Sequence, residues 1–188
     1  MDFTQKIEFL YKSIEDTQST IRAIDIKASF MFVIVFLPIT ALKEILEIGD
    51  LLITTSGYYC FPIVLTIILW FISLYLLFKT IVSISNPAEQ IGGDKPSGAF
   101  YGASLFPLSK IDYFFNFPIK SKKDINEYVK LIPSNEDDLV KELSFEKIKL
   151  TYIREIKIHR SNLLFRATFY WLFCGSLSWA LFLFLQDL

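Results

Sequence analysis

The sequence predicts an all-α membrane protein, in which three transmembrane helices are continuous with a cytoplasmic helical stalk and a small irregular insert. Three apolar runs without a charged side chain carry this prediction: Ala28–Leu42, Tyr58–Phe78 and Ala167–Leu185. The second and third runs hold roughly 20 residues each, enough to cross ~30 Å of hydrocarbon at ~1.5 Å per residue. The charged segments between the runs are amphipathic, which predicts helices in water.

The ends of these runs divide the chain into four parts. We predict an N-terminal cytoplasmic amphipathic helix over 1–27, a transmembrane hairpin over 28–85 with spans at 28–46 and 58–79, a cytoplasmic insert and long helix over 86–162, and a third transmembrane helix with its tail over 163–188.

The first run is short. It has few residues between Lys27 and Lys43, and Pro38 lies inside it. Length alone also allows a buried core helix or a re-entrant segment. However, Lys27 and Lys43 can extend to opposite head-group layers, and apolar residues up to Ile48 prolong the apolar face. We therefore expect a span.

The distribution of cations predicts the orientation. The loop after the first run has one cation, Lys43, against Glu44, Glu47 and Asp50, and residues 186–188 have none. Nearly all other Lys and Arg residues precede the first run or lie between the second and third. The positive-inside rule therefore predicts a multi-pass inner-membrane protein with a cytoplasmic N-terminus and a periplasmic C-terminus. Because 1–27 is charged and amphipathic, we expect the first span to be retained rather than cleaved as a signal peptide.

Two long amphipathic helices are expected to form the stalk. The first has apolar positions at steps of three and four from Ile7 to Ala28, with Thr17 filling a gap and Asp2 or Thr4 as its N-cap. The second begins at a capping box of Ser134 and Asp137 and runs into the third span. Its predicted apolar stripe consists of Phe145, Ile148, Tyr152, Ile156, His159 and Leu163. Packing of the two helices against each other would remove both stripes from water.

The insert over 86–133 is less regular. Gly and Pro residues mark a loop at 91–98, and the aromatic stretch 100–117 predicts irregular structure with a short strand. Ser121 or Asp124 can cap a short helix that extends to Leu131.

No constellation typical of an enzyme is present. His159 has no Ser, Cys or carboxylate at triad-like spacing, Gly92 and Gly93 lack the setting of a phosphate loop, and the acidic run 136–138 fits a helix N-terminus better than a metal site. Cys60 and Cys174 both fall in apolar runs, so neither a disulfide nor a zinc site is expected. We expect no catalytic residue, cofactor, metal or nucleic-acid partner.

Cations near the membrane end of the stalk allow two interpretations. They can hold a phosphate-bearing ligand whose base stacks on an aromatic ring, or they can anchor the helix ends in an anionic leaflet. The residues concerned are Arg22, Lys27, Tyr152, Arg154, Lys157 and Arg160. Asp25 is placed to pair with Arg22 or Lys27.

Small residues in the third run, above all Gly175 and Ser178, predict close helix packing. The packing is either intramolecular or between copies of the chain. Because three spans cannot enclose a sizeable aqueous pore, action on the bilayer would require a homo-oligomer.

The segment Arg22-Ala23-Ile24-Asp25-Ile26-Lys27-Ala28-Ser29 resembles the Asp-x-Lys-Ala-Ser motif of the Pycsar transmembrane effector family, with Asp25, Lys27, Ala28 and Ser29 as the matching residues. The resemblance continues through 105–131, where an aromatic stretch precedes Ser121 and Tyr128, and through 142–185, where a polar helix runs into the last span. It covers most of the chain, from about Ser19 to Leu185.

The resemblance implies a role in antiphage defence. Effectors of this family impair the inner membrane when a partner cyclase makes a cyclic pyrimidine nucleotide, and the infected cell stops supporting the phage. A separate cyclic-nucleotide-binding fold is not recognisable in the sequence. Two alternatives stay open: an effector gated by a cyclic di- or oligonucleotide, and a constitutive scaffold or accessory subunit of a transporter.

Overall fold

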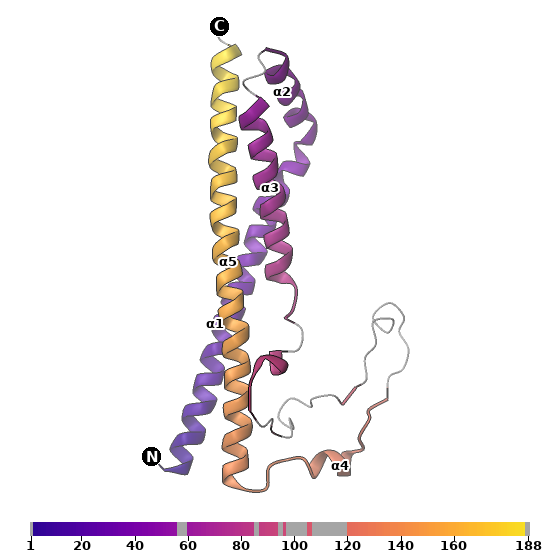
Figure 1. Cartoon of the computed structure of the whole chain (residues 1–188), viewed down its shortest axis with the longest axis vertical. Helices are drawn as coiled ribbons and strands as arrows, with labels where there is room; N and C mark the ends of the chain where they lie inside the picture. The colour runs from indigo at the N-terminus through magenta and orange to yellow at the C-terminus, as the bar shows by residue number, and fades with distance from the viewer. Residues whose placement is uncertain are drawn as a thin grey trace. The chain divides into compact units, whose positions relative to one another are not determined.

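The computed structural model describes residues 2–55, 60–84, 87–93, 96, 105–106 and 120–186, and within these residues every regular element is a helix. The elements are α1 (Phe3–Thr40), α2 (Leu42–Thr55), α3 (Cys60–Ile81), the 3₁₀ helix η2 (Pro87–Gln90), α4 (Ile125–Val129) and α5 (Glu136–Gln186) (Figure 1). Helices α1, α3 and α5 are long and apolar enough to cross a membrane. The predicted all-α membrane fold is confirmed.

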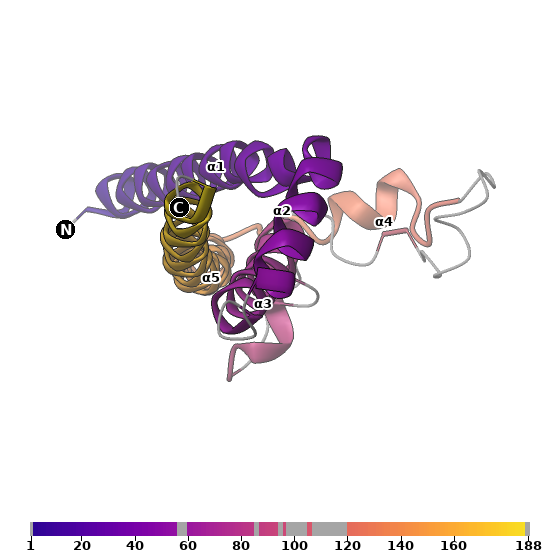
Figure 2. The same ribbon diagram turned by 90° about the horizontal axis from the view of Figure 1, so that it is seen from above.

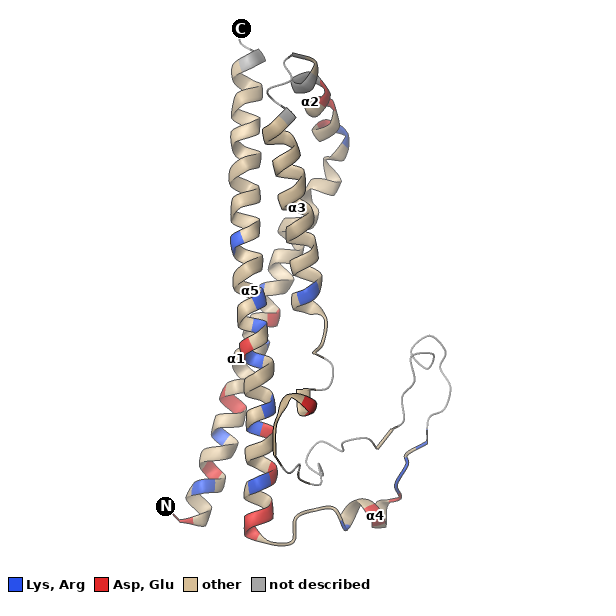
Figure 3. Ribbon diagram, in the orientation of Figure 1, with Lys and Arg blue, Asp and Glu red and all other residues tan. Residues whose placement is uncertain are grey.

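The chain divides into two compact units, and α1 and α5 each contribute to both. The first unit comprises Met1–Ser19 and Asn86–Tyr152, and the second comprises Thr20–Ser85 and Ile153–Leu188. Charged side chains recur along the parts of α1 and α5 in the first unit, whereas α3 is uncharged until Lys79 (Figure 3). Charge thus recurs through the helices of the first unit, whereas the second unit combines the apolar α3 with charged residues such as Asp25 and Lys157 on α1 and α5.

Polar caps fix where the helices begin. The Phe3 amide donates to Asp2 Oδ1 at 2.7 Å, so Asp2 rather than Thr4 is the N-cap of α1. At the start of α5, the Asp138 amide donates to Asn135 Oδ1 at 2.8 Å. The predicted capping box of Ser134 and Asp137 is therefore wrong by one residue. Asn135 is the residue before α5, and its side-chain oxygen accepts the hydrogen bond of the Asp138 N–H, which has no partner within the helix.

The short helix of the insert begins as predicted at one of its two candidate caps. Asp124 and Glu127 form a complete capping box on α4, with the Glu127 amide donating to Asp124 Oδ1 at 2.7 Å. The helix ends at Val129, shortly before the predicted limit. The strand expected within 100–117 lies outside the described residues, apart from 105–106, which are a bend.

The first predicted span, 28–46, differs from the structure at its far end. Helix α1 stops at Thr40, and α2 starts at Leu42 as a separate element. Pro38 lacks an N–H and its ring crowds the preceding turn, which explains the break. The Ala41 amide bonds to the Pro38 carbonyl at 3.2 Å, a tight i→i+3 turn that closes α1.

The second unit has a small apolar core shared by α1, α3 and α5. Met31, Val35, Leu77 and Leu164 form its centre, and the partly buried Phe36, Trp70, Leu74 and Leu76 surround it. The indole N–H of Trp70 donates to the Val35 carbonyl at 2.8 Å, one turn before Pro38. This bond connects α3 to α1 close to the point where α1 ends.

The buried face of α1 follows the predicted steps, whereas that of α5 does not. Ile148 and Leu163 of the predicted α5 stripe are 52% and 39% exposed. Leu143, which the prediction placed with Leu139, Leu150 and Ile153 at the edge of the apolar face, is fully buried. The other buried positions include Lys157, Leu164 and Trp171, spaced from Leu143 by multiples of seven. The prediction is wrong because it followed hydrophobicity alone, while charged residues of α5 are buried against polar partners.

Candidate coupling and ligand site

An ion pair joins the first and last long helices in the second unit. Lys157 Nζ on α5 donates to Asp25 Oδ1 on α1. Lys157 is only 8% exposed, while the Asp25 side chain is about half exposed. A buried ammonium requires a counter-charge, and Asp25 is the partner that supplies it. The carboxylate of the Asp-x-Lys-Ala-Ser motif thus pairs across helices rather than with Arg22 or Lys27.

The rest of the motif divides between interior and surface. Ala28 is 1% exposed, so its small side chain lets another part of the unit approach α1 closely. Lys27 and Ser29 are exposed, and Ser29 Oγ donates to the Asp25 carbonyl at 3.0 Å. Asp25 and Ala28 therefore contribute to contacts within the protein, and Lys27 is the exposed motif cation that a ligand or a lipid head group can reach.

Arg160 caps the end of α3. Its Nη1 donates to the Lys79 carbonyl at 2.8 Å, which satisfies one of the carbonyls left unpaired in the last turn of that helix. Lys79 itself places its ammonium 5.7 Å from the centre of the Tyr75 ring. An aromatic ring and a cation at the end of an apolar helix are typical of a membrane interface.

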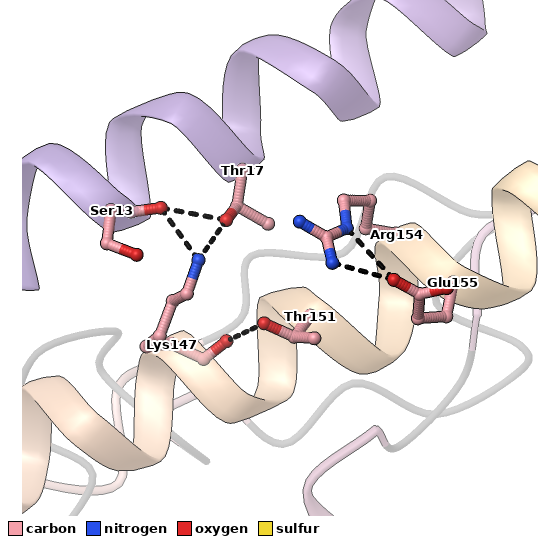
Figure 4. A network of polar contacts seen from close by, with 6 residues as sticks. All are labelled: Ser13, Thr17, Lys147, Thr151, Arg154 and Glu155. Atoms are coloured by element: carbon pink, nitrogen blue, oxygen red, sulfur yellow. Dashed lines mark hydrogen bonds and ion pairs between the residues drawn. The ribbon is translucent and has the colours of Figure 1, made fainter.

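The remaining predicted ligand residues are placed separately. Arg154 binds the neighbouring Glu155, with Nη2–Oε1 at 2.6 Å and Nε–Oε1 at 3.2 Å (Figure 4). Arg22 is exposed, and Tyr152 belongs to the first unit, where it is partly buried. Three of the five predicted cations are thus bonded to protein groups, and only Arg22 and Lys27 are exposed side chains.

The first unit contains a polar contact between α1 and α5 that sequence analysis missed. Lys147 Nζ donates to the Ser13 carbonyl at 2.9 Å and to Thr17 Oγ1, and Thr17 Oγ1 donates to the same carbonyl at 2.8 Å (Figure 4). Thr17 is fully buried. The polar Thr17 inside an apolar stripe was the available signal, since such a residue needs a polar partner on the facing helix.

A carboxylate is also buried in the first unit. Glu146 is 3% exposed and forms an ion pair with Lys149 Nζ through Oε2 at 2.5 Å, while Oε1 has no hydrogen-bond partner. Burial raises the pKa of Glu146, and the nearby Glu142 adds to this effect, against the opposing influence of Lys149. Ionisation of the Glu146 side chain is therefore less favourable in the folded unit than in water.

A cavity of about 680 Å³ lies in the first unit, within the size range of small-molecule sites. Its polar lining includes Lys130, Asp138 and Lys141, and Phe145 and Ile148 supply apolar contacts. Asp138 and Lys141 are already within 3.6 Å of each other. None of the six predicted ligand residues lines this cavity.

Helices α3 and α5 run in opposite directions and carry matching stripes of small residues (Figure 1). The stripes advance in steps of seven and consist of Thr66, Ser73 and Thr80 on α3 and Ser161, Thr168 and Gly175 on α5. A Cβ added at Gly175 would lie 3.6 Å from Thr66 Cγ2. Gly175 thus packs within the chain, whereas Ser178 Oγ bonds to the Cys174 carbonyl of its own helix at 3.0 Å.

Within the part of the chain that the structure describes, no cluster of His, Cys, Asp and Glu is arranged to hold a metal ion. In the comparisons with known proteins, no family model, curated protein or solved structure matches the chain. The arrangement of its own residues therefore has to carry the functional argument.

Proposed function

We propose that this chain is an inner-membrane effector of a cyclic-nucleotide-triggered antiphage defence system of the Pycsar type. The resemblance of residues 22–29 to the Asp-x-Lys-Ala-Ser motif suggests this function. The observation that carries it is the pairing of the motif's Asp25 with Lys157 on the helix that continues into the last span. A motif whose carboxylate connects the two helices just before they enter the first and last spans suits a protein that must change how those spans pack.

In the proposed mechanism, a partner cyclase that senses infection makes a cyclic pyrimidine nucleotide. Arg22 and Lys27 are the exposed cations available to its phosphate. Binding shifts α1 against α5, and because both helices continue unbroken from charged into apolar segments, the change alters packing in the bilayer. Several copies then act together to impair the membrane and cause abortive infection.

The energy required is modest. A ligand moves a two-state equilibrium only by the difference between its affinities for the two states, and a shift from 1:99 to 99:1 needs about 5.5 kcal/mol.

The test is dye entry into cells that express the chain together with a uridylate or cytidylate cyclase. We expect dye entry and loss of membrane potential only when both proteins are active. An unchanged membrane potential in the presence of the nucleotide would overturn the proposal. Thermal shift of the purified chain with a panel of cyclic mono-, di- and oligonucleotides identifies the trigger, and co-purification of a larger membrane partner without toxicity would indicate a scaffold instead.

Substitutions of Asp25 and Lys157 test whether this ion pair couples the two helices. Asp25→Asn should change the nucleotide concentration needed for dye entry, and the charge-exchanged double variant Asp25→Lys with Lys157→Asp should move it back towards the original value. Glu8→Gln is the matched control, because Glu8 and Lys12 form an exposed pair at 2.8 Å within one helix. If Asp25→Asn behaves like Glu8→Gln at equal protein levels, the pair does not couple the spans.

A further inference from the structure

Helix α2 is too short to cross a bilayer by itself. It runs from Leu42 to Thr55, about 21 Å at ~1.5 Å per residue, whereas the hydrocarbon layer is ~30 Å thick. It follows the Pro38 break and passes from the end of α1 towards α3, which it contacts (Figure 2). Its role in the membrane therefore has to differ from that of the three long helices.

The two sides of α2 differ in chemistry, and both are exposed. One side carries the charged and polar residues Lys43, Glu44, Glu47, Asp50 and Thr54. The rest of the described surface carries Leu42, Ile45 and Leu46, which are 49%, 44% and 64% exposed. These exposed apolar side chains of an amphipathic helix need an apolar surface outside the described part of the chain.

The lengths of the neighbouring helices indicate what that surface is. The apolar end of α1, from Ala28 to Thr40, is about 20 Å long, while α3 at about 33 Å matches the whole hydrocarbon layer. The uncharged part of α1 is thus shorter than α3 where α2 begins. The exposed apolar side of α2 also continues the surface of α1, where Leu37 is 65% exposed and Ile39 is 47% exposed.

We infer that α2 lies obliquely in the head-group boundary of the leaflet that the C-terminal end of α1 reaches. Its Leu42, Ile45 and Leu46 side contacts acyl chains, and its acidic side faces water. Because the polar side is acidic, zwitterionic rather than anionic head groups are the fitting surface. A short uncharged segment of α1 next to the full-length α3 favours a locally thinner bilayer beside α1. This inference does not depend on any nucleotide.

Fluorescent labels on single cysteines test it. In a chain with Cys60→Ala and Cys174→Ala, an environment-sensitive dye is attached at the exposed apolar position Leu46→Cys or at Glu47→Cys, about 100° away on the polar side of α2. Leu37→Cys on α1 serves as the lipid-facing reference. All three are exposed positions, so folding should survive, and unchanged helical circular dichroism checks this.

The labelled chains are placed in vesicles of phosphatidylcholine and phosphatidylethanolamine, with iodide on both sides. We expect the dye at Leu46 to emit at shorter wavelength and to be quenched by spin-labelled lipid, as at Leu37. The dye at Glu47 should be quenched several-fold more by iodide than the dye at Leu46. Equal quenching of the two α2 dyes would overturn the inference, and so would protection of Leu46 from both quenchers, which would indicate a covering protein surface.

Discussion

The two units pack α1 and α5 with different chemistry. In the first unit the part-buried Lys147 donates to the Ser13 carbonyl and to Thr17, and the carboxylate of Glu146 is buried. In the second unit the centre is apolar and small residues pack between helices, and the polar contacts between helices include the ion pair of Asp25 and Lys157. The difference follows from the solvent on the outside of each unit.

In water, removal of apolar surface drives the helices together, so the interface can also contain polar groups that select one alignment. In a bilayer, lipid tails are as apolar as leucine, and association depends on close packing. The polar contacts of the first unit therefore fix the alignment, while the small residues of the second unit supply the affinity. Each of the following changes tests one part of this contrast.

The largest effect is expected from truncating a matched pair of leucines on α5. Leu143 in the first unit and Leu164 in the second are both fully buried. Leu143→Ala should lower the free energy of unfolding by about 2–5 kcal/mol, because the truncated side chain loses both its transfer from water and its packing contacts. Leu164→Ala should cost clearly less, since only the packing loss applies in lipid. Hydrogen exchange in lipid nanodiscs, read separately over each segment, measures both. Equal losses of protection would show that the two units do not differ in driving force.

Removal of the polar contact in the first unit should come next. Lys147→Met deletes the donor to the Ser13 carbonyl and Thr17 while retaining the aliphatic stem. Hydrogen bonds to charged groups are worth about 1.5–3 kcal/mol, so protection of the first part of α1 should fall by an amount of that order. Lys141→Met, at an exposed pair with Asp138, is the control and should stay within about 0.5 kcal/mol. A loss no greater than that of the control would mean that Lys147 is not needed for alignment.

Two substitutions of Gly175 test the contact between small residues of α3 and α5 in the second unit. An added Cβ would meet Thr66 at an ordinary contact distance of 3.6 Å, so Gly175→Ala should fit and gain up to about 1 kcal/mol in helix propensity. Gly175→Leu should cost about 1–3 kcal/mol, because the larger side chain must displace α3. Thermal unfolding in detergent compares the two. A leucine variant as stable as the alanine variant would place the α3–α5 contact elsewhere.

The smallest effect is expected from pH. Burial raises the pKa of Glu146 above its usual 4.5, so the folded chain holds a proton that the unfolded chain has released just above that pH. The stability of the first unit should therefore decrease as the pH rises through this window, and Glu146→Gln should remove that decrease and stabilise the unit by under about 1 kcal/mol at neutral pH. Exposed Glu136→Gln is the control for denaturant titrations across this range. A Glu146→Gln variant that keeps the full slope would assign the effect to another group.

The fold could be predicted from sequence where hydrophobicity and structure agree. The uncharged runs in α3 and α5 and the three-four spacing up to Ala28 on α1 reflect hydrophobicity alone, and they appear in the structure as expected, with Ile14, Ile24 and Ala28 buried. Pro38 was visible as well, but its outcome depended on whether neighbouring helices would satisfy the broken turn. In the structure α1 ends at Thr40, although Trp70 on α3 donates a hydrogen bond to the Val35 carbonyl one turn before Pro38.

The candidate site was harder to predict, because the sequence does not show which charged residues form ion pairs across helices. Asp25 was expected to pair within its own helix, and its partner is Lys157, far along the chain. Steps of seven from Leu143 to Trp171 pass through Lys157, so heptad spacing indicates that this lysine lies on the buried face. Arg160 gives no such indication, since a bond to a helix-end carbonyl depends only on where α3 stops.

The pairing of Asp25 with Lys157 also bears on how the protein is made. At a synthesis rate of roughly 5–20 residues per second, Lys157 leaves the ribosome on the order of ten seconds after Asp25. During this interval the nascent hairpin of α1 and α3 has a carboxylate at the bilayer edge without its cation. Assembly of the three helices therefore has to wait for the last one, and a cell that truncates translation before Lys157 would hold an unfinished membrane intermediate that quality-control proteases can distinguish from the completed protein.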